Sequence, residues 1–372
     1  MQIGIPRECR QGETRVAATP ETVKKYISAK HQVIVEHDAG AAAHYPDEDY
    51  TAIGATLGTA SEALGAELVL KVRAPIADEI TGMKSGAVLV GMLDPFDQPG
   101  LQALASAGLT AFALEAAPRI TRAQSLDVLS SQANLAGYKA VLLAANKYER
   151  LFPMMMTAAG TLKAARVVVL GAGVAGLQAI ATARRLGAMV EASDVRPAAK
   201  EQVESLGAKF IDVPFETDEE REIAQGVGGY ARPMPASWMT RQAELVSERC
   251  KQANIIITTA LIPGRPAPTL ISAETVQSMK PGSVIVDLAV ERGGNCPLSE
   301  KDKVVQKHGV TIIGYSNLPS MVATDASALY ARNVLDFLKL IINAEGQLAI
   351  AREDEIVAAC LMCSDGSLLR SA

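Results

Sequence analysis

A glycine-rich turn followed by an acidic residue is the strongest chemical signal in the sequence. The turn reads Gly171-Ala-Gly173-Val-Ala-Gly176, a GxGxxG pattern, and Asp194 lies 18 residues after its last glycine. In this pattern the first glycine permits a tight turn, the second lets a pyrophosphate approach the backbone, and the third lets a helix pack on a strand. The phosphates meet free N–H groups at the helix start, and the acid accepts the adenine-ribose hydroxyls. The pattern therefore predicts a dinucleotide site.

The residues around the acid bear on which dinucleotide is bound. Asp194 favours NAD over NADP, because a carboxylate at this place repels a 2′-phosphate. Arg196 follows two residues later and argues the other way, since an arginine there can hold such a phosphate. NAD is thus favoured by the sequence without being proved. A turn whose glycines serve packing alone is the alternative.

The reactive side chains bear on the reaction. A dehydrogenase that acts on an alcohol or amine removes a proton as well as a hydride, and needs a positioned base such as His or Lys. The only histidines are His31, His37, His44 and His308. None ends a strand expected to face the nicotinamide, and we interpret them as surface or loop residues. Hydride transfer between two nicotinamides needs no base, only two rings held face to face with water excluded.

A second polar cluster occupies the segment Pro118–Ser130. Its polar members are Arg119, Arg122, Gln124, Asp127 and Ser130. Arginine and amide groups here could hold a carboxamide or a ribose-phosphate, and we expect them at a cleft between two domains. The alternative is a charged helix start, with Asp127 in the first turn.

Alternating strands and helices must position these groups. Around the glycine turn we expect a strand at Arg166–Leu170, a helix at Leu177–Leu186 and a strand at Met189–Ser193. Further strands of this domain are expected at Lys209–Val213, Ala253–Thr258, Ser283–Leu288 and Val310–Gly314. Because the strands alternate with helical segments, the pattern predicts a parallel sheet.

The N-terminal region repeats the alternation. Strands are expected at Gln2–Ile5, Gln32–Glu36, Leu68–Val72, Ala87–Met92 and Leu109–Ala113. A helix should begin with Thr19 as N-cap and Pro20 as its first residue. Since Pro6-Arg7-Glu8 follows the first strand in place of a glycine turn, this region should hold something other than a dinucleotide pyrophosphate.

Two long helices and two loops complete the outline. Leu126–Arg150 should bridge two domains, and Asp325–Asn343, capped by Thr324 or Asp325, should pack back on the N-terminal one. Leu151–Thr161 reads as a loop whose methionines, Met154–Met156, pack inside rather than form a contact patch. The charged run Glu216–Glu222 reads as a solvated face. Gly226–Pro235 reads as a mobile lid or an ordinary connection.

The fold class is therefore α/β, with two Rossmann-like parallel-sheet domains, one of them discontinuous, joined by long helices with a cleft between them. We place the N-terminal, dimer-type domain at 1–136 plus 320–372 and the NAD-binding domain at 137–319. The 372 residues, 49% of them hydrophobic, suffice for two cores, and the net charge of −5 does not indicate nucleic-acid binding. Five cysteines without metal-ligand spacing predict free thiols and no metal site. Without a signal peptide or an apolar run of about 18 residues, a soluble cytoplasmic chain is expected.

Several blocks of sequence carry a family resemblance. They are RVAATP (Arg15–Pro20), PRITRAQSLDVLSSQANLAGY (Pro118–Tyr138), GAGVAGLQAI, ASDVRP, GGYAR, TTALIPGRPAP and VIVDLAVERGGNC. Over essentially its whole length the chain resembles the NAD(H)-binding component, domain I of the alpha subunit, of proton-translocating nicotinamide nucleotide transhydrogenase. The resemblance implies Re/Si-specific hydride transfer from NADH to NADP⁺ held on a partner component, coupled to proton translocation.

The resemblance also implies roles for individual residues. Nicotinamide-end contacts would be Arg119, Ile120, Thr121, Arg122, Gln124, Asp127 and Ser130. Of these, Arg119, Gln124, Asp127 and Ser130 form the catalytic cluster, with Gln124 guiding the two nicotinamides together. Pyrophosphate contacts would be Gly171, Ala172, Gly173, Val174 and Gly176, and ribose contacts Asp194, Val195 and Arg196. Gly229 and Tyr230 would lie on a loop that closes over the nucleotide, with Gln242 and Leu261 as further contacts.

The partners implied by the resemblance are a second copy of the chain, an NADP(H)-binding component and a membrane component, which would place the chain at the inner membrane through the complex. Alanine dehydrogenase, of the same fold group, is the second candidate. Arg15 and Lys71 resemble its substrate-binding residues. No histidine occurs in Val90–Asp94, however, and Glu291 stands where its catalytic aspartate is expected. A nucleotide-sensing module without turnover is the third candidate.

Overall fold

The computed structural model describes residues 1–196, 198–225 and 234–369. They fall into two compact units, each with its own sheet and core. Unit 1 comprises Met1–Gln132 and Pro319–Ala372, and unit 2 comprises Ala133–Leu318. The first change of unit lies inside the long helix α6, Val128–Lys147. Gly229 and Tyr230, predicted on the glycine-rich loop, lie outside the described residues.

Unit 1 is built on an eight-stranded sheet in the order β17-β16-β6-β5-β4-β1-β2-β3. The strands are β1 Gln2–Ile5, β2 Gln32–Glu36, β3 Thr56–Gly58, β4 Leu68–Arg73, β5 Val88–Met92, β6 Thr110–Ala113, β16 Leu361–Ser364 and β17 Ser367–Leu368. The first six run parallel, with Ile3 opposite both Val33 and Leu68, whereas β16 runs antiparallel to β6. The sequence does not predict β16 and β17, because such short segments show no periodicity.

Helices cover this sheet. They are α1 Pro20–Ser28, α2 Asp47–Thr51, α3 Ala60–Leu64, α4 Ala77–Gly82, α5 Gln98–Ser106, α12 Ala323–Ile341 and α13 Glu355–Cys360, with short 3-10 turns η1 Ala41–Ala43, η2 Leu114–Ala116, η3 Thr121–Leu126 and η5 Leu318–Val322. Helix α1 begins with Thr19 as N-cap and Pro20 in its first turn, as predicted. The predicted cap of α12 is wrong, because the helix already begins at Ala323, with Val322 as N-cap.

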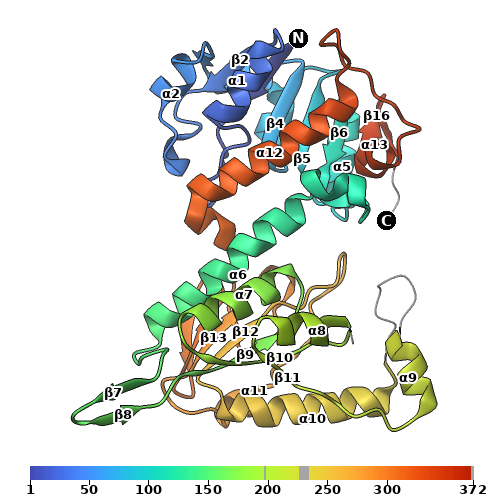
Figure 1. Ribbon diagram of the computed structural model, residues 1–372. Coiled ribbons are helices and arrows are strands. Elements are labelled where there is room, and N and C mark those ends of the chain that lie inside the picture. Colours follow the sequence, from blue (N-terminus) through green and yellow to red (C-terminus); the bar gives the residue numbers. More distant parts are fainter. Residues whose placement is uncertain (197, 226–233, 370–372) are drawn as a thin grey trace. The chain divides into compact units, whose positions relative to one another are not determined.

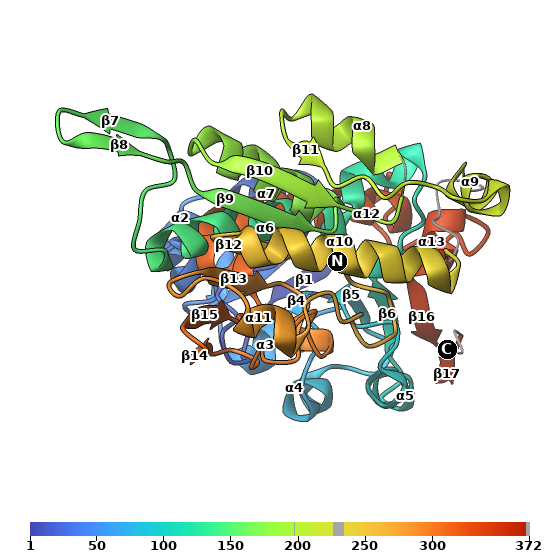
Figure 2. The same cartoon turned by 90° about the horizontal axis from the view of Figure 1, so that it is seen from below.

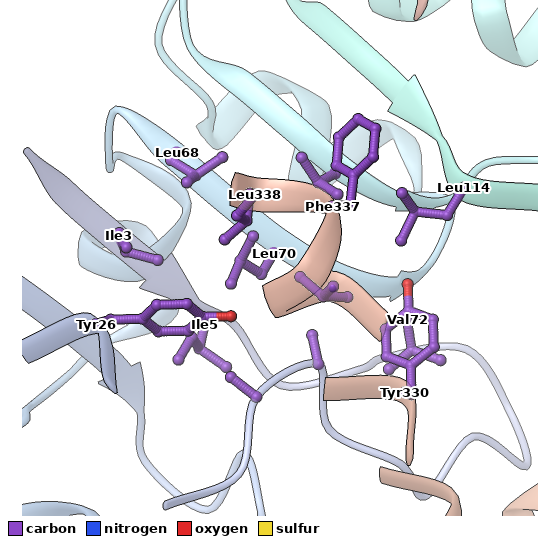
Figure 3. Close-up of a cluster of buried hydrophobic side chains, with 14 of the residues drawn as sticks. Ile3, Ile5, Tyr26, Leu68, Leu70, Val72, Leu114, Tyr330, Phe337 and Leu338 are labelled. Carbon is purple, nitrogen blue, oxygen red and sulfur yellow. The ribbon is translucent and has the colours of Figure 1, made fainter. Parts of the chain in front are cut away.

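The core of unit 1 joins α12 to the sheet (Figure 3). Phe337 and Leu338 point from α12 toward the strands, where Phe337 meets Phe112 of β6 with ring centroids 5.2 Å apart. Tyr330 is fully buried, and its hydroxyl donates to the backbone carbonyl of Lys71 at 2.7 Å. Helix α12, from the second segment of unit 1, therefore completes a core whose other side is formed by strands of the first segment.

Unit 2 is built on a seven-stranded sheet in the order β11-β10-β9-β12-β13-β15-β14. The strands are β9 Arg166–Leu170, β10 Met189–Ser193, β11 Lys209–Phe210, β12 Ile255–Thr258, β13 Val284–Asp287, β14 Val304–Lys307 and β15 Val310–Ile313. All are parallel except β14, which pairs antiparallel with β15. The strand order reverses between β9 and β12, as in doubly wound dinucleotide-binding folds. The predicted fold class, two Rossmann-like α/β domains, is confirmed.

The helices of unit 2 lie along both faces of its sheet (Figure 1). Besides α6 they are α7 Val174–Arg185, α8 Ala198–Ser205, α9 Asp218–Gln225, α10 Ala236–Gln252 and α11 Ala273–Gln277, with the 3-10 turn η4 Val290–Arg292. Helix α7 starts earlier than predicted, inside the glycine turn. The charged run before α10 is not wholly solvated, since Glu220 is buried and accepts from Arg241 at 2.8 Å. Within the described ranges no helix is apolar and long enough to cross a bilayer.

A hairpin replaces the loop predicted after α6. Its strands are β7 Met155–Thr157 and β8 Gly160–Leu162, and Figures 1 and 2 show it extending away from the sheet of unit 2. The prediction that the methionines pack inside is also wrong, because Met154, Met155 and Met156 are 61%, 42% and 74% exposed. A run of apolar residues such as Met154–Met156 does not indicate whether other parts of the chain pack against it.

Gly137 provides a test of how closely α6 and α7 must pack. A Cβ at this position would lie 2.1 Å from the carbonyl oxygen of Ala175. We therefore expect Gly137→Ala to destabilise unit 2 by roughly 1–3 kcal/mol, although alanine favours helix. The free energy of unfolding in urea measures this, with the exposed Asn146→Ala on the same helix as control. A Gly137→Ala chain as stable as the parent would contradict the close packing.

Candidate functional site

The glycine turn follows β9 in unit 2, and two of its glycines are required by packing. Gly171 has a φ of +99°, and a Cβ there would lie 2.6 Å from the Thr259 hydroxyl oxygen. A Cβ on Gly176 would lie 1.8 Å from the carbonyl oxygen of Gly171. At Gly173, by contrast, a Cβ would meet no atom within 4 Å. The middle glycine therefore faces open space in which a ligand can approach the backbone.

Helix α7 presents its N-terminus at this turn. Gly173 is its N-cap and supplies no side-chain cap, and the first helical bond runs from Leu177 N–H to the Gly173 carbonyl at 2.8 Å. The N–H groups of the first turn, including that of Val174, have no partner inside an α-helix. Together with the helix dipole they suit an anion such as a pyrophosphate.

Asp194 ties the turn to the end of β10. Its carboxylate accepts hydrogen bonds from the N–H groups of Ala172 at 2.7 Å and of Arg196 at 2.8 Å. The Arg196 guanidinium donates to the same carboxylate from Nε and Nη2, both at 3.0 Å. These four donors engage the acceptor sites of the carboxylate. The guanidinium is 36% exposed and Asp194 only 7%, so the arginine lies on the solvent side of this pair.

Two further predicted contacts lie in unit 2. Gln242 on α10 is buried, and its amide donates to the Ser193 hydroxyl at 3.4 Å, so it sits beside the end of β10. Leu261 is exposed on the segment after β12. Val195 is exposed next to Asp194. The predicted ribose and pyrophosphate residues thus gather at the carboxyl ends of β9 and β10.

Sequence reasoning missed the residues that hold the segment after β12. Asp287, fully buried at the end of β13, accepts from the N–H groups of Asn295 and Cys296, both at 3.1 Å. The Asn295 side chain in turn accepts from Ala260 N–H at 3.1 Å and donates to the carbonyls of Ala260 and Pro268. In the sequence, the feature that could have indicated this role is the position of Asp287 at the end of the apolar strand β13.

The second polar cluster lies in unit 1, on η3 and the first turn of α6. The buried Ala123 and Leu126 anchor η3, whereas Gln124 is exposed. Asp127 accepts from the backbone N–H of Ser130 at 2.9 Å and from its hydroxyl at 2.6 Å. The structure therefore brings Asp127 and Ser130 together. Asp127 lies directly before α6 and not in its first turn, where the alternative placed it.

The remaining members of this cluster differ in their surroundings. Arg119 and Thr121 are exposed, and Ile120 is partly buried. Arg122 donates to Asp354, the N-cap of α13, at 2.6 Å. The Arg122 side chain is 49% exposed and that of Asp354 21%, so solvent screens this ion pair and it contributes little stability.

The two cations that resemble substrate-binding residues are occupied by the chain itself. The buried Arg15 donates to both carboxylate oxygens of Glu13, at 2.7 and 2.6 Å. The equally buried Lys71 contacts Glu79 and lies 3.5 Å from Glu8. Burial would lower the pKa of Lys71, but the two glutamates raise it above its usual value. Both cations therefore belong to buried ion pairs.

Glu115, which follows β6, is the other unusual acid of unit 1. Its Oε1 accepts from Asp94 N–H at 2.6 Å, whereas Oε2 has no hydrogen-bond partner among the described residues. Burial raises the pKa of Glu115 to about 7. Of the histidines, three are exposed, and only His31 is buried, just before β2. None of the described residues form a cluster of three or more metal-binding acids, histidines or cysteines.

Comparison with known proteins gives consistent matches. The family models described as "Alanine dehydrogenase/PNT" match residues 4–136 (N-terminal domain) and 140–371 (C-terminal domain). An NAD(P) transhydrogenase alpha subunit of Rhodospirillum rubrum is 52% identical over all of this chain and 98% of its own length. A crystal structure of transhydrogenase from Sinorhizobium meliloti, 51% identical, superposes with a TM-score of 0.90 over 99% of this chain and 100% of its own. An alanine dehydrogenase of Methanococcus maripaludis is 30% identical over 92% of this chain and 88% of its own length.

The raised pKa of Glu115 predicts a pH-dependent stability. Relative to its ordinary value of 4.5, the carboxyl holds its proton more tightly in the folded chain, up to a pH of about 7. Its stabilising contribution is therefore complete below the ordinary pKa and is lost as the pH rises through about 7. Between about pH 5 and about pH 8 the parent should lose on the order of 2 kcal/mol relative to Glu115→Gln. Urea unfolding of both proteins measures this, and parallel pH profiles would contradict it.

Proposed function

The chain belongs to the alanine dehydrogenase/PNT family, and we propose that it is the NAD(H)-binding component of a proton-translocating transhydrogenase. In this role it would present NADH to NADP⁺ held on a partner component, with hydride transfer of the Re/Si-specific kind. The observation that carries the proposal is the identity of 52% across the whole chain with a transhydrogenase alpha subunit.

The geometry of unit 2 supports an NAD(H) site on this chain. The pyrophosphate would bind at the N-terminus of α7, in the space that Gly173 leaves open. The adenine ribose would hydrogen-bond to Asp194 once the Arg196 side chain turns away. Gln242 and Leu261 would border the same edge of the sheet. NADP(H) would be held by the partner, because the chain has one GxGxxG turn and an acid at the ribose position.

The chain's own role in the reaction is placement. Bound NADH supplies the hydride, and the protein must hold the ring against the partner's ring and exclude water. Gln124 is exposed on η3, and in this role its amide would orient the nicotinamides. Asp127 and Ser130 hold each other beside it. Arg119 and Arg122 supply positive charge at the same segment. No proton acceptor is required of these residues.

Alanine dehydrogenase is the second candidate, and the buried ion pairs argue against it. A keto acid would need free cations, but Arg15 and Lys71 are paired with Glu13, Glu8 and Glu79. Separating such buried pairs costs several kcal/mol, on the order of 3–5 when one partner is lost. A nucleotide sensor without turnover is the third candidate and is distinguished by assay alone.

The proposed assembly includes a second copy of the chain, the NADP(H)-binding component and a membrane component. The chain would then lie on the cytoplasmic side of the inner membrane, held there by the complex. The exposed methionines of the β7–β8 hairpin are a surface suited to contact with another chain, because exposed apolar patches mark interfaces.

Alanine substitutions at Gly173 and Gly176 test nucleotide binding and folding stability separately. Gly173→Ala should lower the melting temperature only slightly, since its Cβ meets nothing and only the preference for glycine at the N-cap is lost. It should weaken NADH binding by about tenfold or more, because the methyl group occupies the pyrophosphate's approach. Gly176→Ala should instead destabilise unit 2 by more than about 1 kcal/mol. Thermal unfolding and NADH fluorescence titration measure the two effects. Unchanged NADH affinity in Gly173→Ala would place the dinucleotide elsewhere.

Hydride exchange in a reconstituted pair tests the function itself. The chain is mixed with NADH and an NADP(H)-binding transhydrogenase component, and exchange is followed by absorbance. Gln124→Asn should slow exchange at saturating NADH by about tenfold or more while NADH affinity changes little, because the shorter amide misplaces the rings. Equal losses in affinity and rate would contradict this role. Turnover with pyruvate and ammonia alone would favour alanine dehydrogenase, and binding without any turnover would favour the sensor.

A further inference from the structure

We propose that Asn333, on α12, is a positioning residue for hydride transfer. It holds both sides of the η3–α6 junction, through the backbone carbonyl of Ser125 and the hydroxyl of Ser131, and so sets the place of Gln124 and Asp127. The inference rests on the proposed function for its consequence in the reaction, whereas the clamp itself stands on contacts inside unit 1. Asn333 lies some two hundred residues along the chain from the segment it holds.

The two ends of one amide make the clamp. Asn333 Nδ2 donates to the backbone carbonyl of Ser125 at 2.7 Å, and Asn333 Oδ1 accepts from the hydroxyl of Ser131 at 2.7 Å. Ser125 directly follows Gln124, and the two contacts lie on either side of Asp127. Asn333 itself is only 7% exposed. One buried side chain thus ties both flanks of the predicted catalytic segment to α12.

A chain of buried hydrogen bonds supports the clamp from the other side. The Ser131 hydroxyl accepts from the Gln132 amide at 3.3 Å, and that amide also donates to the carbonyl of Ala326 on α12 at 3.1 Å. Gln132 Oε1 accepts from Arg15 Nη1 at 2.8 Å, and Arg15 is held by Glu13. Arg15 therefore helps to orient this network. A buried polar network whose members are all paired is rigid, and it defines one arrangement.

Asparagine suits this position because it carries a donor and an acceptor on one planar group. An aspartate would keep the bond from Ser131 but set a carboxylate oxygen against the Ser125 carbonyl. An alanine would remove both bonds at once, so that the Ser125 carbonyl loses this donor and the Ser131 hydroxyl keeps only Gln132 and the Val128 carbonyl as partners. Neither of those partners lies on α12, so the link to that helix through Asn333 is lost. The buried Ala123 and Leu126 hold η3 to the core, but apolar contact is non-directional and does not define the backbone's pose.

The position of the η3 backbone matters for hydride transfer, because it sets where Gln124 lies. A misplacement of about 1 Å between reacting groups can slow a reaction by about a hundredfold. NADH affinity, by contrast, would come mainly from the glycine turn and Asp194 in unit 2. A loosened η3 should therefore reduce the rate of hydride exchange far more than the affinity for NADH.

The test compares Asn333→Ala, the milder Ser131→Ala and a matched control. The control is Tyr330→Phe, which removes one buried hydrogen bond from the same helix without touching η3. Amide hydrogen exchange of residues 121–131 is measured without nucleotide, and the full chain is then assayed with NADH and the NADP(H)-binding component. NADH affinity is measured by fluorescence.

We expect Asn333→Ala to raise exchange in residues 121–131 by about tenfold and to slow hydride exchange by about tenfold or more, with the NADH dissociation constant within about twofold of the parent. Ser131→Ala should raise amide exchange and slow hydride exchange by smaller factors, and Tyr330→Phe should change neither rate.

Unchanged amide exchange in both Asn333→Ala and Ser131→Ala would overturn the clamp. Faster amide exchange with an unchanged hydride rate, or an equal loss in Tyr330→Phe, would overturn the positioning role. A parent chain without hydride exchange would instead count against the proposed function, and amide exchange alone would then decide the clamp.

Discussion

The contact on which unit 2 depends most is the approach of α7 to the end of β9. A Cβ on Gly176 would lie 1.8 Å from the Gly171 carbonyl oxygen, so no side chain fits between turn and helix. This closeness aims the first turn of α7 across the carboxyl end of the sheet, at the point where the strand order reverses. Gly173 then leaves the approach to that helix end open. The close packing at Gly171 and Gly176 and the open approach at Gly173 are therefore one structural feature, the one that suits a dinucleotide.

In unit 1 the buried cationic side chains form ion pairs with acids of the same unit. Arg15 and Lys71 are buried and matched by Glu13, Glu8 and Glu79 rather than left for a ligand. A buried cation without a partner would be strongly destabilising, so these pairs hold each other in place. Through Gln132 the Arg15 pair also reaches the start of α6 and the clamp of Asn333. The polar interior of this unit is thereby linked to the η3–α6 segment, on which Gln124 is exposed.

Much of the fold could be predicted from the sequence. The buried parallel strand β9 contains a continuous apolar run after Arg166, and its limits agree with the prediction. The limits of β10 also agree, although Glu191 interrupts its apolar residues. The prediction failed where elements are too short for periodicity, as in the β7–β8 hairpin and the C-terminal strand β16. It also failed where a charged residue is buried against a partner elsewhere in the chain, as Glu220 is against Arg241. The roles assigned to Gln124, Asp127 and Ser130 stay predictions.

The sequence by itself determined the local features: the glycine turn and its acid, the alternation that makes two parallel sheets, and the family to which the chain belongs. These depend on neighbouring residues, whose spacing can be read along the chain. Only the tertiary structure decided that Arg15 and Lys71 are neutralised by the chain's own acids, that Asn295 holds the segment after β12, and that Asn333 clamps η3. The Asn295 and Asn333 contacts join residues far apart in sequence, and no local pattern encodes which distant side chain fills a buried polar position. Glu13 is only two residues from Arg15, but the burial of that pair comes from the packing of the whole unit.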